Sequence, residues 1–161
     1  MRSSGPVSVE ESVEVDVPVE TAYNQWTQFE EFPRFMEGVD EVRQLDDTHL
    51  HWVASARGRR REWDAEITEQ KPDERVAWRA TSGKRNAGVV TFHRLSDERS
   101  KVMVQLDYER EGGREAVASI LGLDRRRIRG DLERFSELVE ERGAESGAWR
   151  GTVEQGTVVD R

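Results

Sequence analysis

The chain has 161 residues, of which 36% are charged and 35% hydrophobic, and it carries a formal net charge of −8. Its length suits a single domain with its own core, and its acidic balance disfavours non-specific binding to nucleic acid or to an anionic membrane. The absence of cysteine excludes disulfides, thiolate nucleophiles and Cys-ligated metal or iron–sulfur sites.

No apolar run approaches the roughly 18–20 residues that a membrane-spanning helix needs. The N-terminal segment MRSSGPVSVEES also lacks the apolar core of a secretion signal. We therefore expect a cytoplasmic protein without a membrane span.

The N-terminal part of the chain predicts a strand followed by two short helices. Apolar and polar residues alternate over residues 8–17, as in a strand with one buried face. From Val19 the apolar spacing changes to three or four residues, which predicts a helix of two to three turns with Pro18 in its first turn. Pro33 cannot continue that helix but suits the first turn of a second one, which Gly38 would end.

The middle of the chain predicts a meander of antiparallel strands. Short segments of alternating polarity follow one another, separated by turn-forming Asp, Gly, Pro and Ser residues. Their outward positions, such as Glu62, Asp64 and Glu66, are mostly charged, so the sheet is expected to be covered on one face only. The expected inward residues are Leu50, Trp52, Ala54, Trp63, Ala65, Ile67, Val76, Trp78, Ala80, Val90, Phe92, Val102, Val104, Leu106 and Tyr108.

A long amphipathic helix over residues 125–142 is predicted to cover that apolar face. Gly130 inside it suggests a close approach to the sheet, the alternative being a weak point in the helix. A lead-in helix over residues 115–123 is expected after a flexible joint at Gly112 and Gly113. Residues 144–161 are rich in glycine and polar residues and are expected to form a flexible tail.

Four segments carry a resemblance to a known family: PVETAYNQWTQFEEFPRFMEGV, HLHWVASARGRRREWDAEITEQKPDERVAWRA, NAGVVTFHRL and DLERFSELVEERG. Over residues 7–143 the chain resembles the START-like or SRPBCC superfamily, in particular its bacterial polyketide cyclase/dehydrase-like proteins. The resemblance implies an α+β helix-grip fold, also called START-like or Bet v 1-like. In this fold a curved antiparallel sheet surrounds a long C-terminal helix, and two short helices follow the first strand. It also implies a pocket between sheet and helix for a lipid, sterol, hormone or polyketide.

Large apolar residues are available to line such a pocket. The candidates are Trp26, Phe32, Phe35, Met36, Trp52, Trp63, Trp78, Phe92, Tyr108, Leu132 and Phe135. The same side chains could instead fill the core, since aromatic stripes often serve packing alone. Tyr108 could offer its hydroxyl to a ligand carbonyl, the alternative being a packed tyrosine with a solvated tip.

Three functions follow as hypotheses. The first is binding of a small hydrophobic molecule, as a carrier, sensor or storage protein. The second is a cofactor-free polyketide cyclase or dehydratase that uses the same pocket. The third is a protein-interaction module whose pocket has collapsed.

Few ionisable groups fall on the expected inward face. His49, His51 and His93 would point to solvent, which disfavours a metal site. The carboxylates of Glu62 and Asp64 also point outward, so no acid and base are paired for hydrolysis. The sequence therefore assigns no catalytic residue, metal or cofactor, and favours a binding protein over an enzyme.

Two arginine clusters are the remaining candidate features. Each could recognise an anionic headgroup or an acyl carrier partner through paired hydrogen bonds, or could simply be a solvated surface. Aromatic residues do not alternate with the arginines, which argues against a nucleic-acid site. The clusters are Arg57, Arg59, Arg60 and Arg61, and Arg125, Arg126, Arg127 and Arg129.

Overall fold

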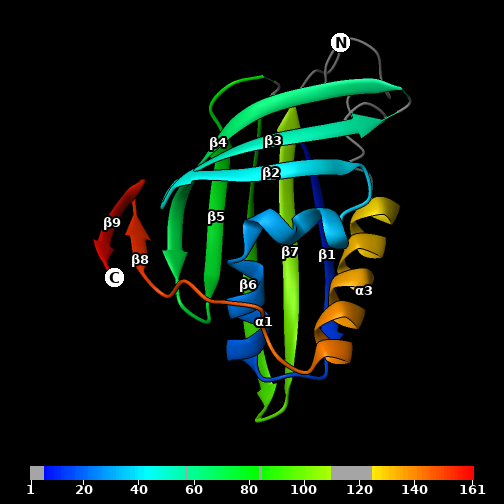
Figure 1. Cartoon of the computed structure of the whole chain (residues 1–161), viewed down its shortest axis with the longest axis vertical. Helices are drawn as coiled ribbons and strands as arrows, with labels where there is room; N and C mark the ends of the chain where they lie inside the picture. The colour runs from blue at the N-terminus through cyan, green and yellow to red at the C-terminus, as the bar shows by residue number, and fades with distance from the viewer. Residues whose placement is uncertain (1–5, 57, 84, 110–124) are drawn as a thin grey trace.

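The computed structural model describes residues 6–56, 58–83, 85–109 and 125–161 (Figure 1). The lead-in helix expected over residues 115–123 and the joint at residues 112–113 lie outside the described residues. The described elements are β1 (Pro6–Val15), α1 (Val19–Trp26), the 3-10 helix η1 (Phe29–Arg34), β2 (Val39–Asp46), β3 (His49–Ala56), β4 (Arg59–Lys71), β5 (Arg75–Ala80), β6 (Asn86–Ser96), β7 (Arg99–Glu109), α3 (Arg125–Arg142), β8 (Thr152–Glu154) and β9 (Thr157–Asp160).

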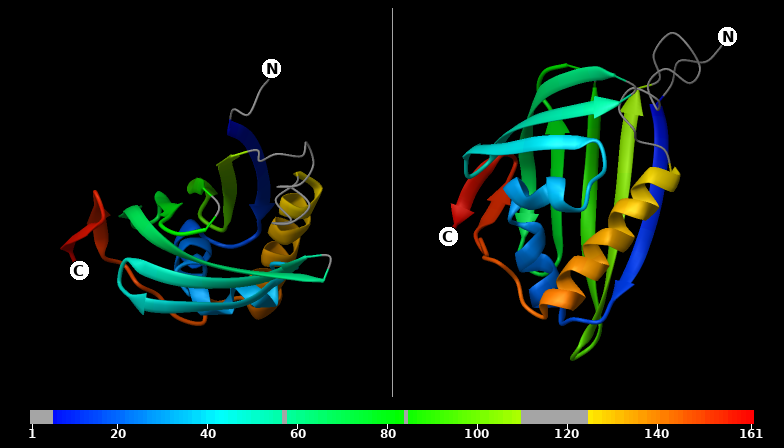
Figure 2. Two further views of the ribbon diagram at one scale, coloured as in Figure 1. Left: turned by 90° about the horizontal axis from the view of Figure 1, so that it is seen from above. Right: turned by 45° about the vertical axis from the view of Figure 1, so that its right-hand side comes forward.

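One antiparallel sheet forms the body of the protein, in the order β1-β7-β6-β5-β4-β3-β2. The first strand pairs with β7, the last strand of the meander, so residues far apart in the sequence lie side by side at this edge of the sheet. Figure 2 shows the sheet curving and α3 lying obliquely across its strands on the inner side. This architecture confirms the predicted α+β helix-grip fold. None of the described helices is both long and apolar enough to cross a bilayer.

The second short helix differs from the prediction. It is a 3-10 helix that already begins at Phe29, and Pro33 lies near its end instead of in its first turn. A 3-10 helix closes with hydrogen bonds over three residues and can accommodate the segment in a single short piece. Phe35 follows the helix directly, and its backbone N–H donates to the carbonyl of Phe32 at 3.1 Å.

Aromatic rings join the three helical segments to each other. Phe135 of α3 lies with its ring centroid 5.2 Å from that of Trp26 and 5.1 Å from that of Phe35. The rings of Trp26 and Phe35 are themselves 5.9 Å apart. All three pairs are tilted or edge-to-face, the arrangement that the charge distribution of aromatic rings favours.

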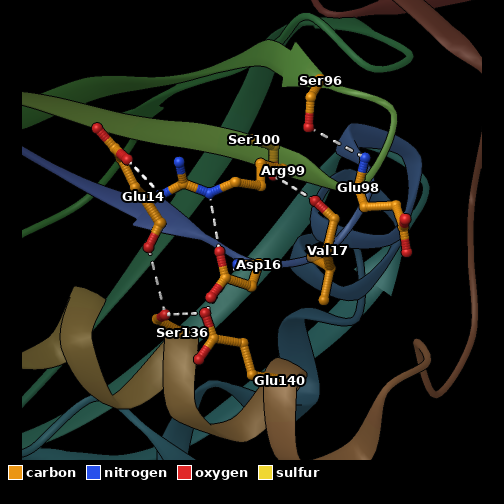
Figure 3. A network of polar contacts seen from close by, with 9 residues as sticks. All are labelled: Glu14, Asp16, Val17, Ser96, Glu98, Arg99, Ser100, Ser136 and Glu140. Carbon is orange, nitrogen blue, oxygen red and sulfur yellow. Dashed lines mark hydrogen bonds and ion pairs between the residues drawn. The ribbon is translucent and has the colours of Figure 1, made fainter.

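A polar network fixes the C-terminal half of α3 against the end of β1 (Figure 3). The Glu140 carboxylate accepts hydrogen bonds from the backbone N–H of Asp16 at 2.7 Å and from the Ser136 hydroxyl at 3.1 Å. Arg99 at the start of β7 binds Asp16 at 2.8 Å and Glu14 at 2.6 Å. The network and the aromatic rings together set the distance between helix and sheet.

The expected close approach at Gly130 is absent. The three atoms nearest to a Cβ atom at Gly130 would all belong to the guanidinium of Arg134 in the same helix, at 3.3, 3.4 and 3.7 Å. The glycine that permits a close approach is Gly88 on β6, where a Cβ atom would lie 2.6 Å from Trp78 Cζ2 and 2.7 Å from Leu106 Cδ2.

The expectation of a flexible tail over residues 144–161 is wrong. Strand β8 pairs with β4, and β9 pairs with β8. Upstream, the backbone N–H of Trp149 donates to Thr27 Oγ1 at 3.1 Å, and Arg150 binds Asn24 at 2.6 Å and Asp73 at 2.7 Å. The segment is ordered because its polar groups meet partners that the sheet and α1 present, which its Gly-rich composition does not reveal.

Val153 in β8 gives a direct test of this packing. It is fully buried, whereas Val159 in β9 is 54% exposed. Val153→Ala is expected to lower the free energy of unfolding by about 1.5–3 kcal/mol, since buried methyl groups are removed from the core. Val159→Ala, the matched control, should stay within about 0.5 kcal/mol of the wild type. Urea denaturation of both variants checks this, and equal effects would contradict a packed C-terminal segment.

Candidate functional site

A cavity of about 110 Å³ lies between the inner face of the sheet and α3. The aromatic side chains therefore do not fill this space completely. Its walls are mostly apolar, and its polar residues are few. The lining residues are Trp26, Met36, Glu37, Gly38, Val39, Trp52, Ala54, Trp63, Trp78, Asn86, Val104, Leu106, Ile128, Asp131 and Leu132.

Neighbouring strands build the tryptophan wall of the cavity. Trp52 of β3 and Trp63 of β4 are directly opposed in the register, and residues opposed in an antiparallel pair share one face of the sheet. Their rings stack with centroids 5.8 Å apart and an angle of 7° between the planes. Trp78 of β5 and Trp26 of α1 add further walls. Such a surface suits a flat or compact apolar molecule.

Gly88 supplies the room that Trp78 occupies. It pairs with Trp78 on β5 and with Leu106 on β7, so all three share the inner face. A methyl group at residue 88 would also lie 2.9 Å from the carbonyl oxygen of Gln105, which is backbone and cannot move aside easily. Glycine at this point therefore leaves room for the Trp78 ring beside β6.

The structure divides the residues expected to line a pocket into three groups. Six of them line the cavity: Trp26, Met36, Trp52, Trp63, Trp78 and Leu132. Phe32 lines a neighbouring space of about 30 Å³, which it shares with Trp26, Met36, Trp52 and Trp78. The remaining four are packed in the core outside the lining of both spaces: Phe35, Phe92, Tyr108 and Phe135.

Asp131 is a cavity residue that sequence reasoning missed. It lies on α3, three residues after Ile128 and four before Phe135, so it interrupts the apolar stripe of the helix. An acidic residue within an apolar stripe is the sequence feature that could have indicated a carboxyl group at the cavity. Its Oδ1 accepts hydrogen bonds from the backbone N–H of Glu37 at 3.1 Å and from Arg134. Burial raises the pKa of the Asp131 carboxyl in spite of these two donors.

The histidines lie away from the cavity. His51 on β3 lies with Nδ1 2.7 Å from the Asp64 carboxylate and Nε2 2.9 Å from the Glu62 carboxylate, and its protonated ring donates a hydrogen bond to each. None of the three residues lines the cavity. His93 Nε2 lies 3.0 Å from the hydroxyl of Thr91. Within the described parts of the chain, no group of three or more His, Cys, Asp or Glu residues is placed to hold a metal ion.

The two carboxylates around His51 make stability depend on pH. Hydrogen bonds to Asp64 and then Glu62 raise the pKa of His51 above its usual value of about 6.5. The stabilisation from protonated His51 is therefore complete below about pH 6.5 and is lost as the pH rises through the higher pKa of the folded state. The free energy of unfolding of His51→Gln should thus fall furthest below that of the wild type in acid. Urea denaturation from about pH 5.5 to 9 checks this; a pH-independent difference would contradict it.

Four arginines of the two clusters bind acidic residues within the described part of the chain. Arg129 and Arg125 of α3 lie 3.0 and 3.3 Å from the buried carboxylate of Glu11. Arg127 donates to the carbonyl of Glu37 at 2.6 Å, and Arg60 lies 3.3 Å from Glu62. Arg57 lies outside the described residues. These clusters therefore hold elements together as well as facing solvent.

Comparisons with known proteins agree with this architecture. Residues 15–137 match the family described as "Polyketide cyclase / dehydrase and lipid transport". An uncharacterized 17.2 kDa protein in the melC2-rnhH intergenic region of Streptomyces lincolnensis is 58% identical over 146 residues, which are 90% of this chain and 97% of that protein.

Solved structures share the fold of this chain. The Zhui aromatase/cyclase of Streptomyces sp. R1128 has a TM-score of 0.73 at 16% identity, over 89% of this chain and 99% of that one. A Deinococcus radiodurans protein has a TM-score of 0.67 at 27% identity, over 84% and 98% of the two chains. A START superfamily protein of Mycobacterium smegmatis has a TM-score of 0.65 at 14% identity, over 84% and 95%. The chain therefore belongs to the polyketide cyclase/dehydrase and lipid transport family.

Proposed function

We propose that this protein binds a small hydrophobic molecule in the tryptophan-lined cavity and acts as a carrier, sensor or storage protein. The observation that carries the proposal is the cavity of about 110 Å³ between sheet and α3, with apolar walls and few polar groups. Membership of a family described by polyketide cyclisation, dehydration and lipid transport supports the same class of ligand.

The volume of the cavity limits the part of a ligand that fits inside. An engineered protein cavity of about 150 Å³ with apolar walls accommodates benzene. A space of about 110 Å³ therefore suits a single ring or a short alkyl chain, with little room to spare. A larger ligand would have to extend out of the cavity or displace its walls.

Isothermal titration calorimetry with ethylbenzene tests the proposal. Trp63→Ala should weaken binding about ten-fold or more, since it removes a stacked wall of the cavity. Glu62→Ala, at the adjacent position of β4, does not alter the lining and should bind as the wild type does. Circular dichroism verifies that both variants are folded. Equal affinities of the two variants would contradict the cavity assignment.

A cofactor-free cyclase or dehydratase is the second candidate, and Asp131 is the observation that favours it. Its raised pKa brings the carboxyl closer to the range in which a group both accepts and releases protons. It also lines an apolar cavity. If the protein is such an enzyme, the wild type catalyses a cyclisation or dehydration. Asp131→Asn should then lose this activity and retain its affinity for the ligand. Equal turnover by both proteins would remove Asp131 from the chemistry.

A further inference from the structure

Arg61 belongs to the cavity side of the sheet, unlike its neighbour Arg60. In the register of β3 and β4, Arg61 is directly opposed to Ala54, and Trp63 is opposed to Trp52. Residues opposed in an antiparallel pair have their side chains on the same face. Ala54, Trp52 and Trp63 all line the cavity. Arg61 therefore projects from the same face of the sheet, two residues before Trp63 on β4.

The polar end of the cavity is the end next to Arg61. The carbonyl of Gly38 accepts a hydrogen bond from the backbone N–H of Ser55 at 2.8 Å, which places Gly38 beside the strand position that follows Ala54. Glu37 and Gly38 both line the cavity. A polar group of a ligand at this end would therefore lie within reach of a long side chain from residue 61.

Arg61 lacks a partner within the chain as far as the structure describes it. The side chain is partly buried, and its Nε atom is shielded from solvent without a hydrogen-bond partner. Among the residues whose side chains the structure describes, no carboxylate forms an ion pair with Arg61. A partly buried cation without a counter-charge is costly, and a bound anion would remove that cost.

The acidic residues of the cavity are held by other arginines. Glu37 lies 3.4 Å from Arg127, and Asp131 binds Arg134. Arg60, on the opposite face of β4, lies 3.3 Å from Glu62. The two acidic residues that line the cavity are therefore paired. Among the described residues, Arg61 is the partly buried arginine on this face of β4 without such a pair, whereas Arg59, the next residue on the face, is exposed.

We propose that the ligand is a small amphiphilic carboxylate whose apolar part lies among the tryptophans and whose carboxylate binds Arg61. The inference rests on the proposed ligand-binding function. Arginine suits this task because its guanidinium binds a carboxylate through two parallel hydrogen bonds. Arg61 and Trp63 are two residues apart on one face of β4, a separation of about 6.6 Å along the strand. An acid whose ring and carboxylate are joined by a short linker, such as 3-phenylpropanoate, suits this spacing.

The test compares 3-phenylpropanoate with its neutral isostere 3-phenylpropanamide by isothermal titration calorimetry. The wild type should bind the acid at least about ten-fold more tightly than the amide. Arg61→Met retains a long apolar side chain without the charge and should bind both probes with the affinity of the amide. Arg60→Met is the matched control on the other face of β4 and should retain the preference. Added salt should weaken binding of the acid alone.

The outcomes separate this inference from the function on which it rests. Equal affinity of the wild type for acid and amide would overturn the inference and leave the hydrophobic cavity in place. A preference for the acid that survives in Arg61→Met would overturn the role of Arg61. Failure of the wild type to bind acid, amide and ethylbenzene would overturn the proposed function and the inference together.

Discussion

Replacement of Phe135 by alanine is expected to lower the free energy of unfolding by about 3–5 kcal/mol, the range for truncating a buried phenylalanine. Phe135 is fully buried at the centre of the contact between α3, α1 and η1. The substitution removes the ring that packs against both Trp26 and Phe35, and the residual space cannot collapse freely because the polar network at Glu140 holds the helix in place.

Glu137→Ala is the matched control for this prediction. Glu137 lies on the exposed side of the same helix, so its replacement should change stability by no more than about 0.5 kcal/mol. Urea denaturation of the two variants under identical conditions gives the comparison. A cost below about 1 kcal/mol for Phe135→Ala would mean that α3 does not depend on this aromatic cluster.

Gly88→Val is expected to abolish detectable binding of ethylbenzene. The Cβ atom alone would come within 2.6 Å of the Trp78 ring and 2.7 Å of the Leu106 side chain, so both must move. Both residues line the cavity of about 110 Å³, which leaves little space into which they can be displaced without narrowing it. Overpacking of this kind also costs about 1–3 kcal/mol of stability.

The neighbouring residue of β6 supplies the control. Ala87 is opposed to Arg79 and Asp107, whose side chains are exposed, so it lies on the outer face of the sheet. Ala87→Val should therefore leave ethylbenzene binding unchanged in the same calorimetric titration. Wild-type affinity in a folded Gly88→Val protein would show that the ligand does not occupy the space beside Trp78.

The fold could be predicted from the sequence because its periodicities are strong. Alternating valines and tryptophans indicated strands with one apolar face, and the stripe that includes Leu132 and Phe135 indicated the covering helix. The residues that line the cavity were harder to separate from those that fill the core. Trp63 and Phe92 both lie on inward positions, yet only Trp63 of the two reaches the cavity, since rings of α1 pack against Phe92.

Other features depend on tertiary contacts that no local pattern encodes. Gly130 was expected to mark a close approach to the sheet, but it is at Gly88 that the side chains of neighbouring strands lie within reach of a Cβ atom. The composition of residues 144–161 predicted a flexible tail, although Arg150 binds Asn24 and Asp73 in other parts of the fold. Arg61 appeared to belong to a solvated cluster, and its place beside the cavity follows only from the register of β3 and β4.

The indole N–H resonances of the protein offer the most direct test of the central claim that the cavity binds a compact apolar ligand. The chain has five tryptophans. Trp26, Trp52, Trp63 and Trp78 line the cavity, whereas Trp149 packs against the core elsewhere. In a titration with ethylbenzene followed by ¹H–¹⁵N NMR, the first four resonances should shift together and saturate, and that of Trp149 should stay in place. No shift of the four at saturating ethylbenzene, or an equal shift of Trp149, would contradict the account.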